Sequence, residues 1–465
     1  MQISPTELLE ADLQARINPE KSRHFERHRL HAARERLMEF ARLPELAPVG
    51  QRITIAGSNG KGSTAFFLSG LATHFLRDTI DTPIALYSSP HLLHVLERIR
   101  FDQQPISAAA AWEGLCALRE LLPNDYAGFS YFEILTLLAL YQFHQKHCDL
   151  QIFEVGLGGR FDATRMAAAQ TVILTRIEKE HTAVLGDTYE QILREKLGIM
   201  TPQCELLIVL PQNPEVKSDL IRSIALDCQP EVQIEFVADR SENRCDYLEL
   251  NRRQAVDCLR LLRQHHIGSG IPHASSADIK ADTPTRSTPA MNEPAQINDS
   301  PARNDIVVRS LANESLFDTM ERTPLPVTLT PPGRLERRVL LHTHIPVLFD
   351  VAHNPPAITR VLRDCRLDST LTDAQECLVI LAMIKGRDPD EIVRVIQAAG
   401  YTQIVQLNTA EFVCGDRVLI MDVPVLERHL WPTERRSPYR AILMLGTHRS
   451  YEYFIRWTEP LSLKL

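Results

Sequence analysis

The sequence predicts an α/β protein with an N-terminal domain built on a mainly parallel sheet and a smaller C-terminal α/β domain. The chain has 465 residues, more than the roughly 250–300 at which a single hydrophobic core stops growing. Short apolar runs typical of buried strands alternate along it with helical segments. Several of these runs end in glycine or polar residues, and parallel α/β sheets carry their ligand sites at such strand ends.

The composition is that of a globular protein and excludes several classes of function. Hydrophobic residues make up 44% and charged residues 24% of the chain, so it can form a core. A net charge of −8 provides no basic field for nucleic acid or anionic lipid. The nine cysteines show no CxxC pair or zinc-like spacing, which indicates reduced thiols.

The sequence also carries no membrane signal. No apolar stretch approaches the roughly 18 residues that span a bilayer, and residues 1–20 lack the apolar core of a signal peptide. We therefore expect a cytoplasmic protein without nucleic-acid or membrane partners. We also expect a monomer, although no motif bears on the oligomeric state.

The N-terminal domain is expected to combine an early helix with four buried strands. Residues 26–42 have apolar side chains at helical spacing, which predicts an amphipathic helix. Strands are expected at 52–56, 84–87, 150–155 and 171–176, and helices at 64–76 and 189–200.

The composition changes sharply after the N-terminal elements. Residues 268–304 are rich in Ser, Pro, Ala, Asp, Asn and Thr, which predicts a disordered insertion because little apolar surface is available to bury. The proline-rich segment 323–332 reads as a linker, so we divide the chain into domains at 1–325 and 326–465. In the second domain, strands are expected at 347–350, 377–382, 403–407 and 441–445.

A glycine-rich segment between the first strand and its helix has the features of a phosphate-binding loop. It reads GSNGKGS at 57–63. Glycines let backbone N–H groups approach phosphate oxygens, and a helix N-terminus favours negative charge. Lys61 would hold the β- and γ-phosphates, and Ser63 or Thr64 would lie near Mg²⁺, although Gly62 departs from the common G-x-x-x-x-G-K-[ST] spacing. A glycine turn with an incidental lysine is the weaker alternative.

Three polar residues stand at or just after the ends of predicted strands. They are Ser89, Glu154 and His181. Because the carboxyl ends of parallel strands meet at one edge of a sheet, these residues can converge over the glycine loop and hold magnesium. A serine and a carboxylate suit Mg²⁺ well, and a histidine less so. Taken alone, His181 is more typical of a surface or helix cap, and Lys196 of a solvated helix.

The second domain contributes an arginine and the polar end of a strand. Arg334 could neutralise phosphate charge through bidentate contacts. Asp350 could accept from ribose hydroxyls or orient His353. An ordinary turn is the alternative for each, since Asn-Pro commonly starts turns.

Eight motifs, in this order, resemble the folylpolyglutamate/dihydrofolate synthase family of the Mur ligase superfamily. They are GSNGKGS at 57–63, YSSPHL at 87–92, SYFE at 130–133, EVGLGGRFDAT at 154–164, EHT at 180–182, REK at 194–196, PGR at 332–334 and DVAHNP at 350–355. The match runs from about residue 26 to 449, interrupted by the insertion.

The resemblance implies an N-terminal P-loop ATPase domain and a C-terminal Rossmann-like domain, with the substrates between them. It implies ligation of L-glutamate to a pteroate or folate carboxylate through an acyl phosphate, with ATP and Mg²⁺ as cofactors. Dihydrofolate synthesis, polyglutamate extension and both together are all compatible with it.

The resemblance also assigns roles to residues. It implies catalytic roles for Lys61, Lys196, His181 and His353, and magnesium binding by Ser89, Glu154 and His181. Lys196 matches a lysine that is carbamylated by CO₂ in the family. The nucleotide would be bound by Ser58, Asn59, Gly60, Lys61, Gly62, Ser63, Gln254, Arg334 and Asp350, and the pterin by Ser130, Tyr131, Phe132, Glu133, Phe161, Asp162 and Ala163.

The chain departs from the family pattern at three places. Glu180 replaces an aspartate before His181, and Ser22-Arg23-His24 replaces Asp-Leu-Gly. Gln254 stands where an asparagine is expected near the adenine, unless Asn251 serves instead. Two other classes of function stay open: a P-loop NTPase or small-molecule kinase, and a nucleotide-binding module without catalysis.

Overall fold

We analysed a computed structural model, which describes residues 4–16, 38–40, 42–77, 80–240, 245–268, 311, 314–323, 326, 331–366, 374–384, 388–431 and 439–460. The predicted helix at 26–42 and the predicted insertion at 268–304 lie mainly outside these residues, as does Ser22-Arg23-His24.

The first sheet has eight strands in the order β4-β3-β2-β5-β1-β6-β7-β8. The strands from β2 to β8 in this order are parallel, and β3 and β4 add an antiparallel edge. Their bounds are β1 (Gln51–Ala56), β2 (Ile84–Tyr87), β3 (Ile99–Phe101), β4 (Gln104–Pro105), β5 (Leu150–Glu154), β6 (Thr171–Leu174), β7 (Leu206–Val209) and β8 (Gln233–Phe236). The central strand β1 is buried along its whole length, so the loop that follows it lies between the ends of β5 and β6.

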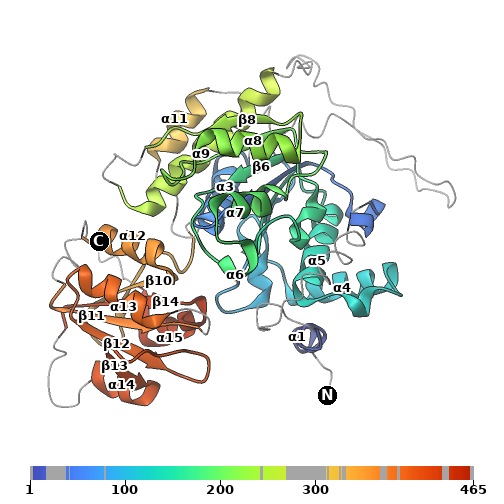
Figure 1. The fold of residues 1–465 in the computed structure, drawn as a ribbon. Coiled ribbons are helices and arrows are strands. Elements are labelled where there is room, and N and C mark those ends of the chain that lie inside the picture. The colour runs from blue at the N-terminus through green and yellow to red at the C-terminus, as the bar shows by residue number, and fades with distance from the viewer. Residues whose placement is uncertain are drawn as a thin grey trace.

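Helices cover both faces of this sheet, because alternate side chains of each strand point to opposite faces. One face packs on α3 (Lys61–Phe75), α9 (Tyr247–Gly268) and α11 (Glu314–Arg322). The other face packs on α1 (Pro5–Gln14), α4 (Ala108–Leu121) and α5 (Tyr131–Gln145), and on α6 (Thr182–Leu185), α7 (Tyr189–Leu197) and α8 (Ser218–Cys228). Figure 1 shows these elements in blue to yellow. Among the helices that the structure describes, none is long and apolar enough to cross a membrane.

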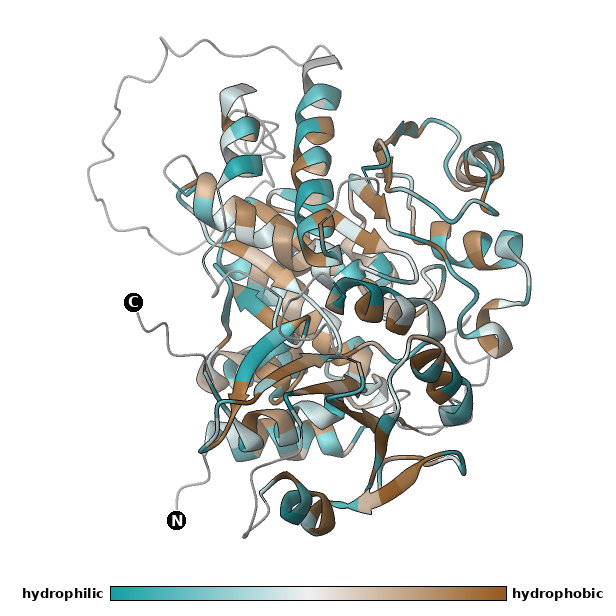
Figure 2. Cartoon of the chain, turned by 90° about the vertical axis from the view of Figure 1, so that its left-hand side faces the viewer, coloured by the Kyte–Doolittle hydropathy of each residue, from teal (hydrophilic) through white to brown (hydrophobic). Residues whose placement is uncertain are grey.

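The second sheet has seven strands in the order β13-β12-β11-β14-β10-β9-β15. Its bounds are β9 (Glu336–Leu340), β10 (Pro346–Asp350), β11 (Cys377–Ala382), β12 (Gln403–Asn408), β13 (Leu419–Asp422), β14 (Ala441–Gly446) and β15 (Thr458–Pro460). One face packs on α12 (Pro355–Cys365) and α13 (Pro389–Ala398), and the other on α14 (Val423–Leu430) and α15 (Tyr451–Trp457). In Figure 2, hydrophobic residues gather mainly on the strands and on the helix faces that cover them.

Short 3₁₀ helices complete the described structure. They are η1 (Pro44–Leu46), η2 (Val95–Arg98), η3 (Tyr126–Gly128), η4 (Ala163–Ala167) and η6 (His448–Ser450).

The two α/β sheets confirm the predicted fold class. The strands predicted at 84–87 and 377–382 have the predicted bounds, and the others agree within two residues at each end. The helix predicted from residue 64 begins at Lys61, because Gly60 takes the left-handed conformation with φ of 93° and closes the loop there. The division at 325/326 falls between the two sheets and stays a prediction.

Candidate active site

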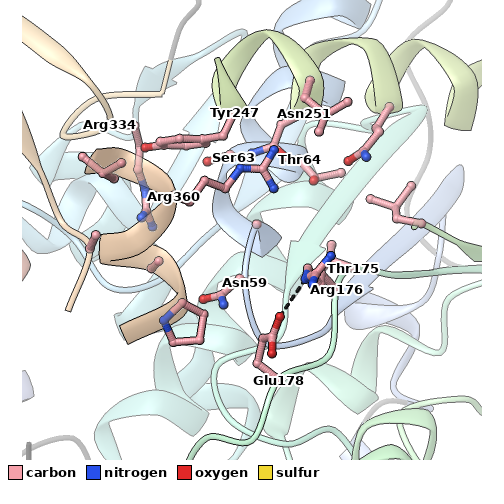
Figure 3. A pocket seen from close by; sticks show the side chains of 18 of the residues that line it. Asn59, Ser63, Thr64, Thr175, Arg176, Glu178, Tyr247, Asn251, Arg334 and Arg360 are labelled. Atoms are coloured by element: carbon pink, nitrogen blue, oxygen red, sulfur yellow. Dashed lines mark hydrogen bonds and ion pairs between the residues drawn. The ribbon is translucent and has the colours of Figure 1, made fainter. Parts of the chain in front are cut away.

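A cavity of about 390 Å³ lies between the carboxyl ends of the first sheet and α12 of the second (Figure 3). The first sheet lines it with the start of α3, the residues after β6 and the first turns of α9. The second sheet contributes Arg334, Asp350 and Arg360. The structure therefore joins residues as far apart in sequence as Asn59 and Arg360 in one pocket, which spacing in the sequence could not reveal.

Two glycines of the loop are required by its geometry. Gly57 has φ of 144° and Gly60 has φ of 93°, both outside the range that other residues readily adopt. A Cβ atom on Gly57 would also lie 1.9 Å from Oγ1 of Thr175. The loop is thus held tightly against the residues that follow β6.

We expect Gly57→Ala to destabilise the protein strongly. The strained backbone should cost about 1–3 kcal/mol and the steric clash with Thr175 about as much again. Gly128→Ala is the matched control, because a Cβ atom there meets nothing within 4 Å. Urea unfolding measures both, and equal midpoints for the two variants would contradict the prediction.

The backbone N–H groups of the loop divide into two sets. Those of Ser58 and Asn59 donate to the carbonyl oxygen of Arg176, at 3.0 and 3.2 Å. Those in the first turn of α3 have no acceptor within the helix. The N–H groups of this segment that lack a helical acceptor are therefore those of the first turn of α3, beginning at Lys61.

Two lysines meet at one carbonyl group of the loop. Lys61 Nζ donates to the carbonyl oxygens of Gly57 and Ser58, at 3.0 and 3.1 Å. Lys196 Nζ donates to the same Gly57 oxygen at 2.7 Å and lies 3.5 Å from Glu180 Oε1. Since Lys196 is 1% exposed, the alternative of a solvated lysine is wrong.

The surroundings of Lys196 and Glu180 lower the pKa of both groups, for different reasons. Burial and the charge of Lys61 lower the pKa of Lys196 to about 8, against the opposing effect of Glu180. Burial alone would raise the pKa of Glu180, but the charges of Lys196 and Lys61 lower it to about 2. Glu180 is therefore a carboxylate at neutral pH, and a substantial fraction of Lys196 is a neutral amine near pH 8.

Glu154 and Ser89, two of the predicted magnesium ligands, lie together above the glycine loop. The backbone N–H of Ser89 donates to Glu154 Oε2 at 3.1 Å. A Cβ atom on Gly62 would lie 3.1 and 3.3 Å from the two Glu154 oxygens, so this carboxylate covers the first turn of α3. Burial raises the pKa of Glu154, and the charges of Lys61 and Arg334 oppose the shift.

His181 precedes α6 as its N-cap and is not part of the contact between Ser89 and Glu154. It is exposed and has φ of 50°. Its charge helps to lower the pKa of Glu180. No group of three His, Cys, Asp or Glu that could hold a metal occurs among the described residues, and the predicted trio with its serine is not a group of that kind.

Asp350 lines the pocket, is buried, and accepts three hydrogen bonds through its carboxylate. Its Oδ2 accepts from the hydroxyl of Tyr247 and, at 2.9 Å, from the N–H of Leu335. Its Oδ1 accepts from the N–H of Ala352 at 2.8 Å. The ring of His353 lies with Nδ1 2.8 Å from the carbonyl oxygen of Val351, so the backbone orients that nitrogen.

Six of the nucleotide candidates line the pocket, whereas Ser58, Lys61 and Gly62 are not among its lining residues. The six are Asn59, Gly60, Ser63, Gln254, Arg334 and Asp350. Asn251 and Gln254 both line it from α9, so the structure offers either amide. Asn354 Nδ2 donates to Asn59 Oδ1 at 3.3 Å. This hydrogen bond connects the glycine loop directly to the start of α12.

The residues predicted to bind the pterin lie outside this pocket, and two of them meet at Gly156. A Cβ atom there would lie 2.8 Å from Phe132 Cζ and 3.2 Å from Asp162 Oδ2. Asp162 also accepts from the N–H of Leu157 at 3.0 Å, and burial raises its pKa.

The other members of the pterin group have local structural roles. Ser130 and Glu133 form the capping box of α5, with Glu133 Oε2 2.7 Å from the N–H of Ser130. Tyr131 is buried under the guanidinium of Arg98, 5.3 Å from its ring centre. Phe161 lies 5.5 Å from the guanidinium carbon of Arg160, and Ala163 is buried at the start of η4.

Sequence reasoning missed several polar pocket residues, among them Thr175, Arg176, Tyr247 and Arg360. The first two follow β6 and could have been found by their place at a strand end. Tyr247 and Arg360 begin or lie within helices, and nothing in their spacing marks them.

Comparison with known proteins supports the resemblance inferred from the motifs. No family model matches the chain. It is 39% identical to the dihydrofolate synthase/folylpolyglutamate synthase of Haemophilus influenzae over 189 residues, which is 40% of this chain and 41% of that relative's length. The chain thus matches about two fifths of the length of this relative.

Solved structures match over nearly the whole chain. The folylpolyglutamate synthase of Mycobacterium tuberculosis complexed with ADP has a TM-score of 0.65 at 19% identity, covering 98% of this chain and 99% of that one. A bifunctional folylpolyglutamate synthase/dihydrofolate synthase with Mn, AMPPNP and L-glutamate bound has a TM-score of 0.58 at 20% identity, covering 91% and 93%. The resemblance to the folylpolyglutamate/dihydrofolate synthases is therefore confirmed: the chain is similar to them in sequence over two fifths of its length and shares their fold over almost all of it.

Proposed function

We propose that the chain is an ATP-dependent ligase that joins L-glutamate to the carboxylate of a pteroate or folate through an acyl phosphate. The observation that carries this is the placement of the Glu154 carboxylate above the first turn of α3, close to Lys61. A helix N-terminus, an ammonium group and a buried carboxylate together suit a magnesium–triphosphate. The sequence relative's name and the ligands of the solved structures point to the same chemistry.

ATP would lie in the pocket between the two sheets. The base would lie at the α9 side, near Asn251 or Gln254, and the phosphates at the first turn of α3. Lys61 would leave the Gly57 and Ser58 carbonyls to contact the β- and γ-phosphates. Arg334 would neutralise phosphate charge from the second sheet.

The residues present fit a magnesium ion. Glu154 is buried and its pKa is raised by burial, so a nearby cation would stabilise its ionised form. Glu154, Ser89 and His181 would hold the ion, which when bound neutralises developing charge on the transferred phosphoryl group.

The reaction would proceed in two displacements. A substrate carboxylate oxygen attacks the γ-phosphorus, the bond to the β-phosphate oxygen breaks, and ADP leaves. The neutral glutamate amine then attacks the acyl carbon, and the bond between that carbon and the phosphate oxygen breaks. The amine loses one proton to the departing phosphate as the amide forms. Lys61 and Arg334 neutralise charge in the first step, and exclusion of water from the pocket protects the acyl phosphate.

Lys196 would act as a carbamate. Its amine must be neutral to attack CO₂, and the pKa of about 8 supplies that form far more readily than an ordinary lysine does. The resulting carboxylate would stand beside the glycine loop, where Lys196 already contacts the Gly57 carbonyl.

We expect Lys196→Ala to lose at least about tenfold in turnover, as residues that support metal ligands typically do. Formate or acetate at high concentration should partly restore it by replacing the carboxylate. Lys196→Arg keeps the charge but cannot be carbamylated, so it should be inactive and resist rescue. Full activity of Lys196→Ala without additives would remove the carbamate from the proposal.

Phosphate release tests the proposed function. Purified protein with ATP and Mg²⁺ should release phosphate only when glutamate is supplied together with dihydropteroate or a reduced folate. Hydroxylamine should trap the acyl phosphate as a hydroxamate, which a simple NTPase or a kinase would not form. Phosphate release independent of glutamate would overturn the proposal, and mass spectrometry of the products would identify the acceptor. We also propose that the protein is a cytoplasmic monomer and that its two domains divide between residues 325 and 326.

A further inference from the structure

Arg360 is a cationic side chain of the pocket to which nothing above gives a role. It lies on α12 of the second sheet and lines the cavity. Figure 3 shows its side chain extending from α12 into the pocket, on the side of Ser63 and Thr64 at the start of α3. Its buried Nε has no hydrogen-bond partner among the described residues.

The groups around Arg360 do not neutralise it. The carboxylate whose charge acts on it is that of Asp364. Asp364 Oδ2 accepts from the N–H of Tyr247, and its Oδ1 accepts from Arg363. Arg360 forms no ion pair with any residue the structure describes, and Arg176 and Arg363 add further positive charge nearby. A partly buried guanidinium among other cations favours an anionic ligand.

Two further polar groups of the pocket lack partners within the described part of the chain. They are the hydroxyls of Thr64 and Thr175, residues that are 0% and 1% exposed. Thr64 belongs to α3 and Thr175 follows β6, so the three unpaired groups come from both sides of the cavity. Since buried polar groups are nearly always hydrogen-bonded, this pocket is built for a polar ligand.

The position of Arg360 favours phosphate over the base of a nucleotide. One face of its guanidinium already lies over the Tyr247 ring, 5.9 Å from the ring centre. The unpaired Nε–H points along the plane of the group and needs an acceptor there, which stacking on a base would not provide. A phosphate oxygen is such an acceptor, and guanidinium binds it with charge-assisted hydrogen bonds.

We propose that Arg360 binds the polyphosphate of the bound nucleotide, as a second arginine from the second sheet beside Arg334. This rests on the proposed function only in that ATP occupies the pocket. Because α12 carries Arg360, the contact would connect the second sheet to the first turn of α3 whenever polyphosphate is bound.

Calorimetry with the full-length protein tests this, using ADP, AMPPNP and adenosine as ligands. Arg360→Met should weaken ADP and AMPPNP roughly 10- to 100-fold and leave adenosine unchanged. Arg360→Lys, which keeps the charge without the planar fork, should recover part of the loss. Arg366→Met is the matched control, since Arg366 lies at the end of the same helix, is exposed and donates to the Ala399 carbonyl.

Three results would overturn the inference. If Arg360→Met has the thermal midpoint of the unmodified protein and binds ADP equally well, Arg360 has no part in binding the polyphosphate, while the proposed function stands. Equal losses for adenosine and ADP would assign the residue to the base instead. Failure of the unmodified protein to bind ADP would overturn the inference together with the proposed function.

Discussion

Lys61→Ala should abolish measurable ligation, with a loss of roughly 100- to 1,000-fold in kcat. Its ammonium group lies at the loop beside the first turn of α3, held by the carbonyls of Gly57 and Ser58. When the nucleotide binds, this cation would turn to the phosphates, and its loss leaves the charge of the transferred group without compensation. The measurement is steady-state phosphate release with saturating glutamate and acceptor.

The control for this variant is Lys217→Ala. Lys217 is exposed and does not line the pocket, and its Nζ donates to the carbonyl of Pro214. This change removes the same charge without touching the pocket, so kcat should stay within about twofold, as for other surface substitutions. If Lys61→Ala turned over as fast as this control, Lys61 would have no part in phosphoryl transfer.

The fold could be predicted where strands are long and buried. The apolar runs that became β2 and β11 are unbroken, and β5 is interrupted only by Gln151 before it ends at Glu154, so these strands could be recognised. β3 and β4 have only three and two residues, which is too short to show the alternation of apolar and polar residues that predicts a strand. β13 is largely exposed on the edge of the second sheet, so it lacks the apolar pattern of a buried strand.

The site could be predicted only where polar side chains stand at the ends of predicted strands. Glu154 and Ser89 were found in this way, and the structure places them in contact. The burial of Lys196 could not be deduced, because its neighbours in sequence are charged and its partner, Glu180, lies 16 positions away. Arg360 was missed for a similar reason, since its neighbours in space come from another sheet.

Glu154→Gln should cost at least about 10- to 100-fold in activity, the range for residues that merely support metal ligands, while leaving the fold as stable or more so. Burial raises the pKa of Glu154, so its ionised form opposes folding: stability falls as pH rises from the unfolded pKa to the folded one. Glutamine keeps an oxygen for the N–H of Ser89 but carries no charge to desolvate.

The two effects separate binding from structure. Without ligands at neutral pH, the variant should unfold at an equal or higher temperature than the unmodified protein. With Mg²⁺ and AMPPNP, the unmodified protein should gain more thermal stability, because it alone offers a carboxylate to the ion. Glu215→Gln, at an exposed position, controls for loss of one negative charge. Equal stabilisation of all three proteins by Mg²⁺ and AMPPNP would exclude Glu154 as a magnesium ligand, whatever happened to activity.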